Sequence, residues 1–180
     1  MSTEGKSGLD LLHDELGRAV ALEAQLHALV SRQLEHEEVQ RHGRAVDWLQ
    51  RLEPRVHAHR VSLGKTLERL AARPSPLRQA LGPALDSLAE WTKRAGEAPG
   101  PELTRDLREA YALLSSTVAS YLVVAVTADV LDDRQTVALA QAHSDDANAF
   151  LDELASLIVS LTREELLDAL DSEFAARNGE

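Results

Sequence analysis

Apolar residues recur along most of this 180-residue chain at spacings of three and four, the period of amphipathic helices. The first such segment runs from about residue 8 to residue 39, and the second from about residue 44 to residue 72. Pro54 lies inside the second segment, where it removes a backbone hydrogen-bond donor. Because the apolar stripe keeps its phase across Pro54, we expect a kinked helix there rather than a break.

A longer connection follows the second helix. The sequence Arg73-Pro74-Ser75-Pro76 ends that helix, and Ser75 is a suitable N-cap for a shorter helix that continues to about residue 94. The sequence GEAPG at 96–100 predicts a loop. The two halves of the chain are therefore joined by a crossover that contains a short helix.

The third long helix, expected at about 101–131, contains the uncharged stretch AYALLSSTVASYLVVAVTA (110–128). Its length is close to that of a membrane span. Its content is different: hydroxyl side chains interrupt it, and acidic residues follow at once. We therefore expect the buried centre of a soluble bundle rather than a membrane span.

The remaining residues predict two further helices. Asp133 can cap a fourth long helix that ends near Ser160. Thr162 and Glu165 form a T-x-x-E capping box, which predicts a separate last helix to about residue 176. This layout is that of an all-α four-helix bundle with one long crossover and an extra C-terminal helix. It is expected to be one domain over 1–180, with loose ends at 1–7 and 177–180.

Composition limits the function classes. The net charge of −11 argues against binding to nucleic acid or to anionic membranes, and aromatic residues at 3% are too few for a base-stacking surface. The chain has no cysteine and therefore no thiolate metal site or cysteine nucleophile. Ser115 and Ser116 have no base at a recognisable spacing, so no catalytic residue is predicted. The first ten residues do not show the basic segment and apolar run of a signal peptide, so we expect a cytoplasmic location.

Four polar residues interrupt the apolar stripes. Glu23 lies in the middle of the first stripe, where a carboxylate must be paired, protonated or bound to a metal. His59 lies at the margin of the second stripe, and His143 and Asp146 are neighbours on the inward face of the fourth helix. These residue types would suit one hard or borderline metal ion, such as iron, manganese or zinc.

Two other interpretations need no metal. In the first, Glu23 pairs with His59 or with an arginine inside the bundle, His143 pairs with Asp146, and the buried contacts fix the register of the helices. In the second, a cavity in the bundle holds a small molecule. The first is preferred to the metal site, because no helix shows the i,i+3 Glu/His pair that di-iron bundles carry twice.

Two segments are similar to the ferritin-like superfamily, and most similar to the small bacterial stress-induced proteins of the YciF-like kind. The segment YLVVAVTADVLDDRQTVALAQAHSDDANAFLDELASL resembles the passage between the third and fourth helices of that family. Leu131-Asp132-Asp133 stands at its short turn and Asp145-Asp146 at its inward acidic pair. The segment LLHDELGRAVALEAQL, with Glu23, resembles the first helix.

The resemblance implies a Glu on each of two helices and Glu-x-x-His pairs on the other two. Glu23 and His59 match these ligands, and Asp146 matches as a shortened acid. Neutral residues stand at three other ligand positions: Val56, Thr117 and Ala149. The resemblance therefore predicts a degenerate, non-enzymatic member that acts through protein contacts or in stress response. Because the third helix is apolar on more sides than one bundle interior requires, we also expect a two-fold symmetric homodimer.

Overall fold

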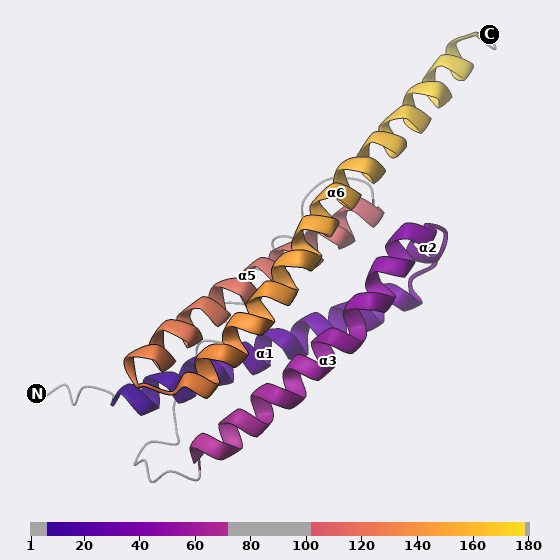
Figure 1. Cartoon of the computed structure of the whole chain (residues 1–180). Helices are drawn as coiled ribbons and strands as arrows, with labels where there is room; N and C mark the ends of the chain where they lie inside the picture. Colours follow the sequence, from indigo (N-terminus) through magenta and orange to yellow (C-terminus); the bar gives the residue numbers. More distant parts are fainter. Residues whose placement is uncertain (1–6, 72–101, 179–180) are drawn as a thin grey trace, which may run out of the picture.

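The computed structural model describes residues 7–71 and 102–178, and these residues form helices and no strand (Figure 1). The all-α prediction is confirmed for this part of the chain. The short helix expected at 75–94 and the loop expected at 96–100 lie outside the described residues. The described helices are α1 (Gly8–Glu35), α2 (Glu37–Gln40), α3 (Gly43–Ala71), α5 (Glu102–Val130) and α6 (Arg134–Asn178).

A capping box begins α1. The Ser7 side chain accepts a hydrogen bond from the Asp10 backbone, and the Asp10 carboxylate accepts one from the Ser7 backbone. The helix ends at Glu35, because His36 adopts an extended backbone, and the single turn of α2 follows. The first helix is therefore shorter than the predicted 8–39, and its last turn is a separate element.

Pro54 lies within α3, which continues without a break from Gly43 to Ala71. Continuity across Pro54 was the sequence-based expectation, and it is confirmed. The apolar stripe explains it: Leu52 and Val56 on either side of Pro54 are both buried in the core, and their burial holds the chain in one helix across the missing hydrogen bond.

The turn between α5 and α6 is fixed by two aspartates. Asp132 adopts a positive φ of 57°, which Asp tolerates better than most residues. The Asp133 carboxylate accepts a hydrogen bond from the Thr136 backbone N–H, so it caps α6 as predicted. Arg69 near the end of α3 donates to the same carboxylate at 2.9 Å. The cap therefore also joins α3 to the start of α6.

Helix α6 is one element of 45 residues, so the prediction of a separate helix after Thr162 is wrong. The sequence from Arg134 to Asn178 contains no glycine or proline that could interrupt it. Glu165 does not cap a helix; it accepts a hydrogen bond from Thr104 of α5 at 2.5 Å. The Thr162–Glu165 spacing here is an ordinary i,i+3 pair inside a continuous helix.

The four long helices form a bundle in which α1 lies against α3 and α5, and α6 lies against α5 and α3 (Figure 1). At about 1.5 Å per residue, the 45 residues of α6 extend well past the 29 residues of α5. From Leu166 onward the described side chains of α6 are exposed, and this end of α6 projects beyond the bundle (Figure 1). These observations support a helical bundle with one overhanging helix.

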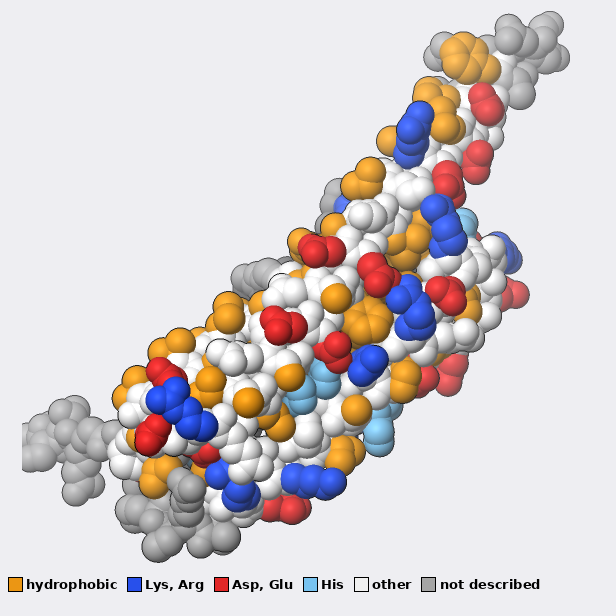
Figure 2. All heavy atoms as spheres, in the orientation of Figure 1, with side chains coloured by type: hydrophobic (Ala, Val, Ile, Leu, Met, Phe, Trp, Pro, Cys, Tyr) orange, Lys and Arg blue, Asp and Glu red, His pale blue; other side chains and the backbone are white. Residues whose placement is uncertain are grey.

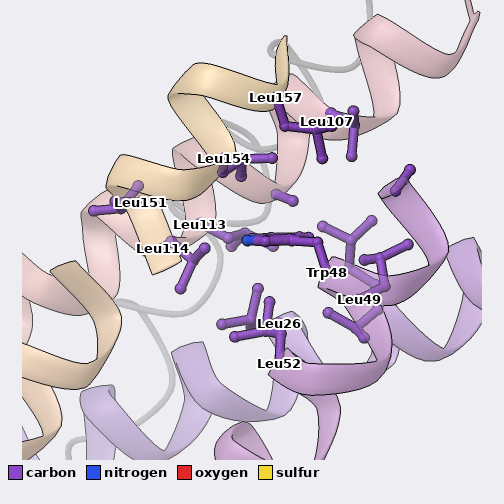
Figure 3. Packing of buried hydrophobic residues seen from close by; sticks show 14 of the residues in the cluster. Leu26, Trp48, Leu49, Leu52, Leu107, Leu113, Leu114, Leu151, Leu154 and Leu157 are labelled. Carbon is purple, nitrogen blue, oxygen red and sulfur yellow. The ribbon is translucent and has the colours of Figure 1, made fainter. Parts of the chain in front are cut away.

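Two apolar clusters fill the interior. In the larger one, the Trp48 indole lies among leucines of all four long helices (Figure 3), and its Nε1 donates to the Phe150 carbonyl at 3.3 Å. The smaller one surrounds Leu12, Leu63 and Val124 near the other end of the bundle. Tyr121 belongs to this smaller cluster, and buried polar side chains such as Glu23, His59 and His143 belong to neither cluster.

Helix α5 has an exposed apolar side. Its Leu103–Val130 segment is long and apolar enough to cross a membrane, and only 39% of its most apolar window is buried inside the structure. A single helix of this kind is weak evidence for a membrane span, because core helices of soluble proteins pass the same test. The partial burial does establish that much of the apolar surface of α5 faces away from the bundle.

A buried polar layer as the candidate functional site

The polar layer lies between the two apolar clusters and is built from all four long helices. Glu23 comes from α1, His59 and Ser62 from α3, Tyr121 from α5 and His143 from α6. Glu23 and Tyr121 are essentially inaccessible to solvent, and the two histidines are buried. The helical periodicity places Glu23, His59, Tyr121 and His143 on inward faces, each with apolar neighbours about one turn away. The layer is thus a cross-section of the bundle.

Glu23 is the centre of the layer. Its Oε1 accepts a hydrogen bond from the Tyr121 hydroxyl and lies 3.0 Å from His59 Nδ1. The predicted pairing of Glu23 with His59 is confirmed. The Tyr121 partner was not predicted, although Tyr121 carries one of the hydroxyl groups that interrupt the uncharged stretch of α5, and this could have marked it.

His59 links the centre of the layer to its edge. Its Nε2 lies 3.3 Å from Asp146 Oδ2, and the same carboxylate oxygen lies 3.6 Å from Arg55. Asp146 is half-exposed, so the chain of polar contacts runs from the buried Glu23 to solvent at the α3–α6 boundary. Arg55 and Asp146 therefore close the open side of the layer.

His143 stacks on His59 and does not pair with Asp146. The two imidazole rings have centroids 4.0 Å apart, with an angle of 20° between their planes. His143 Nε2 lies 3.0 Å from the Ser62 hydroxyl. The predicted His143–Asp146 pair is wrong, because Asp146 turns toward α3. Ser62 was missed, although it follows His59 by three residues and thus shares its helix face.

The surroundings shift two ionisation equilibria in this layer. Burial, together with the neighbouring His59, lowers the pKa of His143 from 6.5 to about 4, against a smaller opposing effect of Asp146. Burial, reinforced by the Glu23 carboxylate, raises the pKa of Tyr121 far above its usual range. At neutral pH, His143 is therefore a neutral imidazole and Tyr121 a neutral hydrogen-bond donor.

Two buried polar atoms of the layer have no hydrogen-bond partner: Glu23 Oε2 and His143 Nδ1. An unpartnered buried polar atom is unfavourable and calls for an explanation, such as a bound water or ion. An interpretation of the layer as a ligand site depends on these unpartnered atoms.

The donor set does not fit a pair of metal ions. Helix α5 offers the hydroxyls of Thr117, Ser120 and Tyr121 in this region but no carboxylate, and Thr117 already donates to the Leu113 carbonyl. Val56 is packed into the apolar core, and Ala149 is exposed. Within 7–71 and 102–178, no group of three or more His, Asp or Glu side chains is arranged to hold a metal ion.

A line of charged contacts continues the layer along the boundary between α3 and α6. Figure 2 shows acidic and basic side chains on the face over these two helices, with histidines in the same band. The bridges that cross the boundary are Arg44–Glu164, Arg51–Glu153, Arg55–Asp146 and Arg69–Asp133. Most are exposed and individually weak, but their uneven spacing along the two helices is matched in only one register of α3 against α6. The layer and this boundary together specify how α3 packs.

A hollow on the same boundary bears on the small-molecule interpretation. It has a volume of about 360 Å³ and is lined by Trp48, Leu157 and charged side chains that include Arg51 and Glu153. It opens at the surface beside the Trp48 cluster and does not reach the buried layer residues. This hollow is therefore separate from Glu23 and its partners.

Comparison with protein-family models gives no match, and neither the curated proteins nor the solved structures contain a significant match to this chain.

Proposed function

We propose that this chain is a non-enzymatic, ferritin-like helical bundle that acts through protein–protein contacts and associates as a homodimer. The observation that carries the proposal is the outward face of α5, which is apolar and accessible. The resemblance described above adds a role in stress response to the proposal, and the proposed location is the cytoplasm. The buried layer then serves to hold the bundle in one packing arrangement rather than to perform chemistry.

The outward face of α5 exposes an unusual number of large apolar side chains for so acidic a protein. Leu122, Val123, Val126 and Val130 have exposed fractions of 57%, 48%, 66% and 81%. Between Arg108 and Asp129 the only charged residue of α5 is Glu109, which binds Arg32 of α1. Single exposed apolar side chains are common, but a contiguous apolar strip on a protein of net charge −11 indicates a contact surface.

The layer itself supports a structural role. Its central contact joins Glu23 of α1 to His59 of α3 and to Tyr121 of α5, so one carboxylate specifies the register of three helices. Buried polar groups of this kind select one packing arrangement among several that are similar in apolar burial. This role needs no ligand and no reaction.

Sedimentation velocity of matched variants tests the proposal. Val126→Asp places a charge on the α5 face, and Val61→Asp places the same charge on a comparably accessible site of α3. We expect the wild type and Val61→Asp to dimerise at micromolar concentration and Val126→Asp to remain monomeric with unchanged helicity. A monomeric wild type, or equal dimerisation of both variants, contradicts the proposal.

The second candidate function is binding of one iron, manganese or zinc ion by Glu23, His59, His143 and Asp146. The unpartnered atoms Glu23 Oε2 and His143 Nδ1 favour it, since both are buried in the layer and both are possible ligands. Against it, His59 already contacts carboxylates through both ring nitrogens. Elemental analysis of protein purified without chelators decides: a stoichiometric metal that is lost in His59→Ala supports the site, and a sub-stoichiometric content excludes it.

A further inference from the structure

We infer that two copies of this chain pair antiparallel through α5, with the two-fold axis near Ala119. This inference rests on the proposed homodimer and specifies its geometry. It depends on the order of charged, large and small side chains along the outward face of α5. That order is self-complementary only when the two helices run in opposite directions.

The outward face is defined by helical spacing and exposure. At 100° per residue, Arg108, Ser115, Leu122 and Val126 lie within about 40° of one another. The accessible residues Tyr111 and Asp129 lie on one side of this line. The face therefore begins with a cation, ends with an anion and has small residues near its middle.

The positions of the end charges select the direction. An antiparallel pair centred between residues 118 and 119 places Arg108 beside the partner's Asp129, and this contact occurs twice. A parallel two-fold pair places Arg108 beside Arg108 and Asp129 beside Asp129, which is repulsive at both ends. Asp129 binds Arg134 through Oδ1 only, so Oδ2 remains available to accept from the partner. Charge complementarity thus favours the antiparallel arrangement.

The side chains between the ends also match in size. The same centre places Tyr111 opposite the partner's Val126, and Leu122 opposite the partner's Ser115. Each large side chain meets a smaller one, as close packing of two helices requires. Ala119 lies at the centre, where a small residue lets the two helix backbones approach most closely.

The size of the face indicates the strength of the contact. A strip from Arg108 to Asp129 is about 32 Å long and about 10 Å wide, roughly 300 Å² in each copy. Stable interfaces bury about 1,200–2,000 Å² in total. The strips of the two copies together amount to about 600 Å², half the lower limit for a stable interface, so we expect pairing through α5 to be weak.

Single cysteines test the geometry directly, because the natural chain has none. In the antiparallel pair the two copies of residue 119 meet at the axis, whereas the two copies of residue 126 are about 22 Å apart. We expect Ala119→Cys to form a disulfide-linked dimer under mild oxidation. Val126→Cys should link to itself no more than the control Val61→Cys on α3, but should link to Tyr111→Cys when the two proteins are mixed.

Charge reversal provides a second measurement on the full chain. Arg108→Glu and Asp129→Arg should each weaken dimerisation about threefold to tenfold, and the double variant should restore it to within about twofold. Lys65→Glu, an exposed site on α3, changes the net charge as Arg108→Glu does and should have little effect. If the double variant dimerises more weakly than either single variant, the antiparallel geometry is overturned.

The outcomes separate this inference from the proposed function. A dimer in which Val126→Cys links to itself as readily as Ala119→Cys overturns the antiparallel direction while the homodimer stands. A dimer with no linkage above the Val61→Cys control overturns pairing through α5. A chain that stays monomeric but floats with phosphatidylcholine vesicles, in a manner lost in Val126→Asp, overturns both and indicates a membrane surface.

Discussion

His59 of α3 and His143 of α6 stack face to face, with their ring centroids 4.0 Å apart. The pair lies on the boundary of α3 and α6, which ion pairs and hydrogen bonds also cross. Two imidazoles in this position cannot both carry a charge without repulsion, and the carboxylates of Glu23 and Asp146 already flank His59. The protonation of His143 therefore depends on whether the bundle is folded.

The stability of the bundle should fall between pH 6.5 and about 4. The folded state lowers the pKa of His143 to about 4, whereas the unfolded chain takes up the proton near 6.5. Protons bind preferentially to the unfolded state in this window, so this contribution is complete above pH 6.5 and is lost as the pH falls. The expected loss is on the order of 2 kcal/mol, allowing for partial solvent contact. Urea unfolding at several pH values measures it.

A histidine substitution isolates the source of this pH dependence. His143→Gln removes the titrating group but keeps a hydrogen-bonding side chain beside Ser62, so its stability should vary less between pH 6.5 and 4. His57→Gln, at an exposed position of α3, is the control and should titrate as the wild type does. An unchanged slope in His143→Gln would show that another group causes the acid sensitivity.

Tyr121→Phe should destabilise the bundle by about 1–3 kcal/mol. The Tyr121 hydroxyl donates to the buried Glu23 carboxylate, and its removal leaves a buried acceptor with one partner fewer. Tyr111→Phe makes the same chemical change at an accessible position of α5 and should alter stability by less than about 0.5 kcal/mol. Chemical denaturation of the two variants gives the difference, and equal effects would contradict the central place of Glu23.

Asp133→Ala should lower stability by about 1–2 kcal/mol, because it removes the N-cap of α6 and the partner of Arg69. Burial alone would raise the pKa of Asp133, but its hydrogen bonds from Arg69 and Thr136 outweigh that effect and hold the pKa below its usual value. Asp133→Asn keeps the cap and loses only the charge, so its stability should lie between those of the wild type and of Asp133→Ala. Asp145→Ala on the exposed face of α6 is the control, and thermal unfolding ranks all four proteins.

Deletion of 166–180 should leave the stability of the bundle unchanged within about 0.5 kcal/mol. The side chains described beyond Glu165 are exposed, and Glu165 itself still binds Thr104 of α5. The deletion also removes the exposed apolar residues Leu166, Leu167, Leu170 and Phe174. A large fall in the unfolding temperature would show that the overhanging part of α6 packs against the folded chain.

The sequence predicted the long helices and the inward polar residues because both depend on local periodicity. Glu23 stood out as a carboxylate among leucines, and its burial beside His59 follows from the meeting of two inward faces. The continuity of α3 across Pro54 could likewise be read from the phase of the apolar stripe.

Other features depend on contacts between helices, which periodicity does not specify. Thr162 and Glu165 have the spacing of a capping box, but whether a helix restarts there is decided by its neighbours, and Glu165 instead binds Thr104 of α5. Asp146 and His143 share a helix face, yet the position of α3 gives them different partners, His59 and Ser62. The rotation of α3 about its own axis determines which of its side chains face Asp146 and His143.

The most direct test of the account is the molar mass in solution, measured by static light scattering over a micromolar concentration series of the wild type and of Val126→Asp. The account predicts that the wild type rises toward twice the 19.7 kDa mass of the chain, and that Val126→Asp stays at that mass. A wild type that remains at the mass of one chain throughout the series would contradict it.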